Sequence, residues 1–299
     1  MSKSRQILPG RTYLITRRCT QRQFLLRPDE KTNAAFLYCL AEAAARHGIL
    51  VVAWLAMSNH YHAVLHDPCA RLPAFLEHFH KMAAKALNAR WGRTENLWAT
   101  EQTSVVWLPT PQDVFDKVVY TLANPVAADL TEHAMDWPGA SALGHLDGKE
   151  LTVHRPSFFF REDGTMPPVV RLRSARPPEL IGEVDGWARS VRAAIADIER
   201  DARTRRQRAG IRVVGRRAVR RTSQSARPTK REPQRKLRPT IACRTEERRL
   251  AELRKAREFQ AAYRFARNRY VDGEHYVVFP AGTYLFRRLG VCCAQYAPG

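Results

Sequence analysis

Two histidines separated by a single residue stand beside an apolar run of the chain. The segment Ala53–His66 reads AWLAMSNHYHAVLH and contains His60, Tyr61 and His62. Because side chains alternate between the two faces of a β-strand, the histidines would project from one face, about 7 Å apart along the chain, and Tyr61 from the other. Two imidazoles at that spacing can bind one divalent metal ion. Two half-exposed histidines on a sheet face would give the same pattern, so the pair alone leaves both interpretations open.

The residues after Thr110 predict an amphipathic helix. Thr110 and Asp113 have the spacing of a capping box, and the helix would run over Pro111–Asn124 because Pro125 disfavours its continuation. On a helical wheel, the apolar side chains of this helix fall within an arc of about 140°. This apolar stripe consists of Val114, Phe115, Val118, Val119 and Leu122.

Tyr120 and Asn124 lie outside this apolar arc. They are four residues apart and therefore neighbours on the helix surface. A phenol can serve as a covalent nucleophile, although it is protonated at neutral pH and needs activation. A surface tyrosine that packs on a neighbouring loop is the alternative interpretation, and the helix by itself does not distinguish the two.

The elements around these residues predict an α+β fold. Their order, β-α-β-β-α-β-α, is that of a ferredoxin-like split βαβ unit, an antiparallel sheet with helices on one face. Ser58 and Asn59 suit a tight turn, so the two central strands would form a hairpin that carries the histidines on the open face of the sheet. The predicted strands cover Thr12–Arg18, Ile49–Met57, His60–Asp67 and Leu97–Trp107, and the predicted helices before the tyrosine helix cover Asn33–His47 and Leu72–Trp91.

The positive charge of the chain is concentrated in its second half. The 299 residues carry a net charge of +21. Residues 1–150 contain 16 Lys and Arg against 14 Asp and Glu, whereas residues 151–299 contain 34 against 15. A field of this kind attracts polyanions, most often nucleic acid. A solvated basic tail that only aids solubility is the alternative, but most of these residues are arginines, which suit phosphate.

The cysteines and the apolar runs point to the cytoplasm. The six cysteines form no C-x-x-C pair, which fits a reducing compartment and gives no zinc-ribbon signal. No run of apolar residues is long enough to span a membrane, and the N-terminus lacks the apolar region of a signal peptide. With 44% hydrophobic residues, the chain can form a substantial core.

Taken together, these motifs resemble a known family. The His-Tyr-His strand followed by a helix ending YTLANPVAADL resembles the REP-associated tyrosine transposases, which belong to the single-tyrosine HUH transposase superfamily. The resemblance covers about residues 8–145 and includes the initial PGRTYLITRR. The family usually has Pro-Asn before its His-x-His, where this chain has Ser58 and Asn59. This difference does not touch the residues that would do chemistry.

The resemblance implies a role for each candidate residue. His60 and His62 would be metal ligands, Asn124 the third ligand and Tyr120 the nucleophile. The enzyme would be a metal-dependent single-stranded DNA endonuclease and strand transferase that acts on hairpin repeats through a 5′-phosphotyrosine. Its ion would be Mg²⁺ or Mn²⁺, and the protein would be cytoplasmic and associated with a bacterial nucleoid. Whether it is a monomer or a homodimer stays open.

The resemblance and the composition of the second half together divide the chain. Residues 1–150 would be an HUH single-tyrosine transposase-like catalytic domain, residues 151–199 a connecting region, residues 200–245 a disordered basic linker and residues 246–299 a helical or mixed C-terminal extension. Within these segments we expect helices over Trp187–Ile198 and Glu246–Arg269 and a strand-like stretch over Tyr276–Arg288. Candidate DNA-binding residues are Arg17, Arg18, Lys81, Lys85, Arg90, Arg93, Arg216, Arg217, Arg220 and Arg221.

Three other functions compete with this one. A catalytically silent regulator that binds DNA or RNA hairpins could use the same fold. An RNA-recognition module uses a similar sheet, but stacks bases on aromatic side chains where this chain presents histidines. A metallohydrolase for small molecules would have no use for the basic half.

Overall fold

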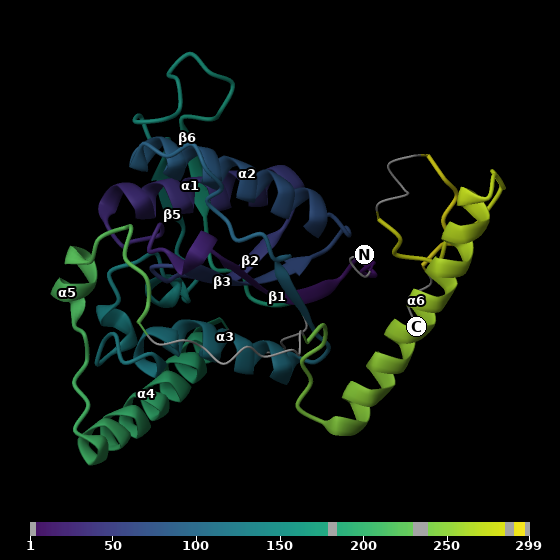
Figure 1. Cartoon of the computed structure of the whole chain (residues 1–299). Helices are drawn as coiled ribbons and strands as arrows, with labels where there is room; N and C mark the ends of the chain where they lie inside the picture. Colours follow the sequence, from purple (N-terminus) through teal and green to yellow (C-terminus); the bar gives the residue numbers. More distant parts are fainter. Residues whose placement is uncertain (1–3, 179–183, 230–238, 285–289, 297–299) are drawn as a thin grey trace.

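A four-stranded antiparallel sheet is the centre of the computed structural model, which describes residues 4–178, 184–229, 239–284 and 290–296 (Figure 1). Its strands lie in the order β2-β3-β1-β4. They are β1 (Arg11–Arg18), β2 (Leu50–Ala56), β3 (His60–Asp67) and β4 (Ser104–Leu108). The expected α+β fold with a split βαβ sheet is confirmed.

The two faces of the sheet are covered by different helices. Helices α1 (Glu30–His47) and α2 (Leu72–Trp91) lie together on one face, as predicted, and α3 (Pro111–Ala127) lies against the other (Figure 1). The ring of Tyr61 packs between α1 and α2, whereas that of His62 contacts α3. The face that carries the histidines is therefore partly covered, because the apolar stripe of α3 is buried against it.

Strand pairing sets the neighbours of the histidines. In the antiparallel register, β1 places Thr16 opposite His62 and Arg18 opposite His60. On its other side, β2 places Leu55 opposite His62. Residues directly opposite each other on paired strands share a face, so these three side chains surround the histidines.

Helix α3 begins as predicted and ends later than predicted. Its capping box is present: Thr110 Oγ1 accepts from the backbone N–H of Asp113, and Asp113 Oδ2 accepts from the backbone N–H of Thr110. The predicted end at Asn124 is wrong, because the helix continues past Pro125 to Ala127. A proline inside a helix lacks one N–H, but the helix is continued by the bond from Ala128 N to Asn124 O. Asn124 thus lies in a regular turn, directly after Tyr120 on the helix surface.

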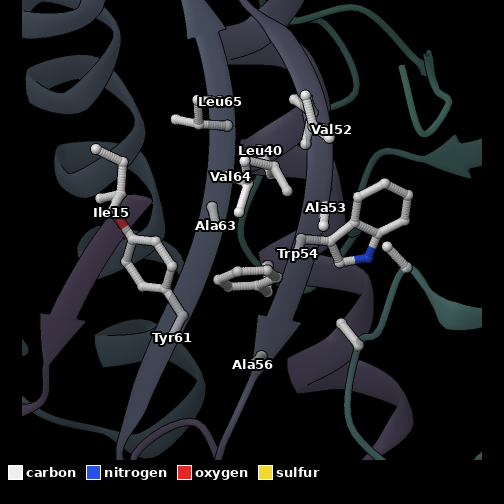
Figure 2. Packing of buried hydrophobic residues seen from close by; sticks show 14 of the residues in the cluster. Ile15, Leu40, Val52, Ala53, Trp54, Ala56, Tyr61, Ala63, Val64 and Leu65 are labelled. Carbon is white, nitrogen blue, oxygen red and sulfur yellow. The ribbon is translucent and has the colours of Figure 1, made fainter. Parts of the chain in front are cut away.

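One hydrophobic cluster unites the sheet with residues well beyond 150. Figure 2 shows part of it, around Trp54, Tyr61 and Leu65. A hairpin that the sequence did not reveal, β5 (Leu151–His154) and β6 (Val169–Leu172), packs on α1. Phe160 from the loop of this hairpin contacts Tyr38, with ring centroids 4.9 Å apart. The cluster also includes Val153, Val170, Leu172, Ala188, Val191, Ile195 and Ala202.

Helix α4 (Val184–Ala209) packs along α3 and is longer than the predicted Trp187–Ile198. Its last turns are rich in arginine and alanine, which both favour helix. These turns and the short helix α5 (Arg216–Arg221) lie in the segment 200–245 that was expected to be disordered. Residues 230–238 of that segment lie outside the described residues. Strand β4 is shorter than predicted, because residues 97–99 follow the end of β1 separately.

Helix α6 (Glu246–Val271) belongs to a smaller cluster of its own. This cluster is formed by Phe259, Tyr263, Ala266, Val277 and Phe279. Backbone atoms connect it to the start of the chain, with Ile7 N donating to Gly282 O at 3.0 Å. In place of the expected strand over Tyr276–Arg288, residues 276–284 contain only the isolated bridge of Phe279 to Cys293, and residues 285–288 lie outside the described residues.

Short 3-10 helices lie at Thr20–Arg22, Ala134–Asp136 and Leu143–His145. Among the described residues, none of the helices combines the length and the apolar character needed to cross a membrane.

A tyrosine–histidine pair behind β3 predicts a pH dependence of stability. Tyr61 Oη lies 2.6 Å from His80 Nε2. Burial, with a smaller contribution from Arg17, lowers the pKa of His80 to about 3. The unfolded chain, with an ordinary histidine pKa of about 6.5, therefore binds a proton that the folded chain does not between these values. The contribution of neutral His80 to stability is therefore fully present above the unfolded pKa, and it is lost as the pH falls towards the folded pKa.

We expect His80→Gln to weaken this dependence, because glutamine retains a hydrogen-bonding partner for Tyr61 and does not titrate. As the pH falls from 6 to 4, the free energy of unfolding of the native protein should fall more steeply than that of the variant, by up to about 1.4 kcal/mol per pH unit. Chemical denaturation at several pH values measures both slopes. Equal slopes for the two proteins would contradict the assignment.

Candidate active site

The structure brings four of the predicted site residues together at one end of the sheet. His60 Nε2 and His62 Nε2, both on β3, are 3.1 Å apart. From α3, Asn124 Nδ2 lies 3.5 Å from His62 Nε2. The Tyr120 ring stands edge-on to the His62 ring, with centroids 5.5 Å apart. A strand and a helix far apart in the sequence thus form a single site.

The outer nitrogen of each histidine has a hydrogen-bond partner. His60 Nδ1 lies 2.7 Å from Asn59 Oδ1, which can only accept, so this nitrogen carries the proton. His62 Nδ1 lies 2.8 Å from Thr16 Oγ1, a hydroxyl that accepts when this nitrogen carries the proton. With both Nδ1 atoms protonated, the Nε2 atoms present lone pairs to the same point. Partners of this kind orient histidine ligands in metal sites.

Both imidazoles are held neutral. Burial, assisted by the charges of Arg18 and Arg22, lowers the pKa of His60 to about 4. Burial also holds the pKa of His62 well below its usual value, assisted by His60 and Arg18. His62 is only 4% exposed. Neutral imidazole is the form that binds metal ions.

The donor atoms present fit a divalent metal ion. Metal–nitrogen bonds of about 2.1 Å at right angles would place two nitrogens about 3 Å apart. The two Nε2 atoms have this spacing. Rotating the Asn124 amide by half a turn would present Oδ1, an oxygen donor of the type that Mg²⁺ and Mn²⁺ accept. Among the described residues, no third His, Cys, Asp or Glu joins the pair, so Asn124 is the candidate for the third ligand.

Tyr120 lies at the edge of the site and is accessible. Its side chain is 47% exposed, although it contacts the buried His62. Lys117, one turn earlier on α3, places Nζ 5.4 Å from the centroid of the Tyr120 ring. A large substrate can therefore reach the phenol from solvent, and a positive charge accompanies it.

Two of the predicted DNA-binding residues are held inside the fold. Arg17 donates to Thr103 Oγ1 at 2.6 Å and to Ala99 O at 3.3 Å, and burial lowers its pKa. Arg90 donates to Asp29 Oδ1 at 2.6 Å. Both guanidinium groups connect structural elements, so they have little capacity left for phosphate.

The remaining basic residues divide between the two faces of the sheet. Lys81 and Lys85 are exposed on α2, on the face opposite to the histidines, and half-buried Arg93 follows that helix. Arg18 lies beside His60 in the β-register. The four exposed arginines of α5 are Arg216, Arg217, Arg220 and Arg221.

Three residues of the site were not predicted. Asn59 was assigned only to the turn, and Thr16 has no signal in the sequence, because its contact with His62 depends on the pairing of β1 with β3. Lys117 could have been found, since it precedes Tyr120 by three residues on the predicted helix.

Comparisons with known proteins give partial similarities. No protein-family model matches the sequence, and no curated protein matches it. Among solved structures, a REP-associated tyrosine transposase bound to a REP hairpin is 18% identical, covering 48% of this chain and 82% of its own, with a TM-score of 0.40. A protein described as a transposase, from Deinococcus radiodurans R1, is 19% identical. The match covers 36% of this chain and 85% of that protein, with a TM-score of 0.28.

A third similar structure has a different activity. The tRNA(His) guanylyltransferase of Saccharomyces cerevisiae is 14% identical, covering 43% of this chain and 64% of its own, with a TM-score of 0.31. Similarities of this extent do not identify a family.

The environment of the histidines predicts their titration. In the folded protein, both rings should remain neutral as the pH falls below 6, and His60 should titrate near pH 4. NMR spectra of ring-labelled protein, recorded from pH 7.5 to the acid limit of folding, measure both midpoints. His60→Gln and His62→Gln assign the signals. A midpoint near 6.5 for either ring would show that it is solvated and not enclosed as described.

Proposed function

We propose that this protein is a metal-dependent endonuclease and strand transferase that acts on single-stranded or hairpin DNA through a covalent phosphotyrosine at Tyr120. One observation carries the proposal: an accessible phenol lies in contact with a neutral histidine pair and one helical turn from a third donor. A tyrosine with a purely structural role in the core would be buried, whereas Tyr120 is 47% exposed. A small-molecule site would not require a nucleophile at the protein surface.

The proposed reaction exchanges one phosphodiester for another. Tyr120 Oη attacks the phosphorus and loses its proton, and the bond from phosphorus to the 3′ oxygen breaks. That oxygen takes up a proton and leaves as a free 3′-hydroxyl, while the 5′-phosphate remains on the tyrosine. Because the number of phosphoester bonds is conserved, attack by a 3′-hydroxyl reverses the step and joins strands without an external energy source.

The residues around Tyr120 supply orientation and charge. His60, His62 and Asn124 would hold Mg²⁺ or Mn²⁺, and a bound ion polarises a phosphate and stabilises the negative charge that develops on it. Asn59 and Thr16 keep the two Nε2 lone pairs directed at one point. The ammonium of Lys117 stands near the phenol ring and supplies a positive charge that attracts a phosphate to this edge of the site.

DNA is the substrate class that the charge supports. The net charge of +21 attracts polyanions, and arginine is its main source. A single strand also suits an exposed nucleophile at the edge of a sheet, because its phosphates can approach without a duplex partner. Helix α5, which carries four exposed arginines, packs through Val219 near the end of the sheet where the histidines lie.

Tyr120→Phe should abolish cleavage and leave DNA binding within a few-fold of the native protein, because the phenol oxygen does the chemistry and the basic surface does the binding. The native protein should also form a covalent adduct with labelled single-stranded or hairpin DNA in Mn²⁺, visible on a denaturing gel. Tyr270→Phe, a substitution on α6 far from the histidines in the sequence, is the control. Cleavage by the Tyr120→Phe protein at the native rate would disprove the assignment of the nucleophile.

Removal of the metal ligands should have graded effects. EDTA should stop cleavage by the native protein, and His60→Ala and His62→Ala should each lose it even in added Mn²⁺. Asn124→Ala should be milder, since water can replace a neutral amide ligand. The matched control is His154→Ala, an exposed histidine on β5. Calorimetry with Mn²⁺ in the absence of DNA gives a second measurement. Cleavage that is insensitive to chelator would leave the histidines a structural role only.

A further inference from the structure

Helix α5 is docked next to the histidine site by a single apolar side chain. Val219 is buried in a cluster with Leu55, Met57 and Trp137. Leu55 lies opposite His62 in the sheet, and Met57 is bonded to His60 across the β2–β3 turn, with Met57 N donating to His60 O at 2.9 Å. The helix therefore lies beside the end of the sheet where the histidines begin.

Backbone hydrogen bonds hold the chain on both sides of α5. Before it, Val214 N donates to Asp129 O at 3.0 Å, just beyond the end of α3 that carries Asn124. After it, Ala226 O accepts from Phe24 N at 3.1 Å. Phe24 follows the short turn whose Arg22 O accepts from the side chain of Asn59, the partner of His60. Residues 214–227, which we call the α5 segment, thus extend from the end of α3 to the loop beside His60.

The α5 segment carries only positive charge. It contains five arginines and no acid. Of these, Arg216, Arg217, Arg220 and Arg221 are exposed, and none makes an ion pair or hydrogen bond with a described residue. Neighbouring arginines behave differently, since Arg205 and Arg206 on α4 are paired with Asp129. Structural ion pairs are available in this region, and the α5 arginines do not use them.

Two of these arginines line a hollow beside α5. Arg217 and Arg221 are four residues apart, so their side chains share one side of the helix. They border an open hollow of about 500 Å³. Its other lining residues, Val214, Gly215, Ala218 and Thr222, are small or polar. Arginines around an open hollow with no bulky apolar lining suit a phosphodiester better than an apolar ligand.

We propose that the α5 segment binds the sugar–phosphate backbone of DNA and holds it next to the histidine–tyrosine site. The choice of DNA rests on the proposed function; the placement of the segment does not. Val219 and the backbone bonds fix the segment in advance, so less conformational entropy is lost on binding than for a free basic tail. The backbone could belong to a duplex stem or to a single strand, and both present the same phosphates.

The test compares two pairs of charges on opposite faces of the sheet. Arg217→Gln/Arg221→Gln removes the pair at the hollow. Lys149→Gln/Arg161→Gln removes two exposed charges, one just before β5 and one in the β5–β6 loop, where the hairpin packs on α1. All proteins also carry Tyr120→Phe and are studied in EDTA, so binding is measured without cleavage. Fluorescence anisotropy over a range of salt concentrations uses two probes, a labelled single-stranded oligonucleotide and a blunt-ended hairpin.

We expect the α5 pair to weaken binding about tenfold at low salt and to reduce the slope of log K against log salt by about 1.4 for the single strand, since each phosphate contact contributes about 0.7. The Lys149/Arg161 pair should leave both quantities near the parent values. Arg217→Lys/Arg221→Lys, which keeps the charge, should restore most of the affinity. Thermal unfolding of every variant checks that the docked helix is intact.

Each result has one meaning. Loss on the single-stranded probe alone assigns the segment to the strand, loss on the hairpin alone assigns it to the stem, and either supports the proposal. Unchanged affinity and slope in the α5 variant, or an equal loss in the Lys149/Arg161 variant, would overturn it. Because no cleavage occurs in this assay, a failure of the proposed chemistry would appear only in the adduct experiment with Tyr120 and would leave the binding result readable.

Discussion

The packing of β3 between its two neighbouring strands is the constraint on which the site depends. Tyr61 points into the aromatic rings of Phe36, Phe79 and Trp98 and bonds to His80. That anchor fixes the orientation of the strand, because a shift of one residue would exchange its two faces. The histidines on either side of Tyr61 are then forced onto the opposite face, and their positions follow from the core behind them.

Helix α3 has to satisfy two demands at once. Its apolar stripe must cover the histidine face of the sheet, and its remaining surface must present Tyr120 and Asn124 at the edge of that face. The regular turn through Pro125 meets both demands, since it keeps Asn124 one turn beyond Tyr120. The result is a gradient of exposure across the site, from the buried His62 to the half-exposed tyrosine. The two imidazoles remain neutral, while the phenol of Tyr120 remains accessible from solvent.

The basic residues illustrate why charge counts and charge positions differ. Composition correctly indicated that the second half carries the positive field, but it treated Arg17, Arg90 and the α5 arginines alike. In the structure, Arg17 and Arg90 are bonded inside the fold, and Lys81 and Lys85 lie on the far face. Helix α5 lies near the histidine end of the sheet because Val219 packs on Leu55 and Met57 there. A count cannot separate these cases, since each depends on what a side chain meets in space.

The sequence by itself determined the local elements, because their signals are local. Alternation placed His60 and His62 on one face, the capping box located the start of α3, and helical spacing grouped Tyr120 with Asn124. Only the tertiary structure decided that these two pairs meet, that Thr16 lies opposite His62, and that the β5–β6 hairpin and α4 share the core. These facts depend on strand register and on burial between distant segments. Such contacts arise from the packing of whole faces against one another, and no short stretch of sequence records them.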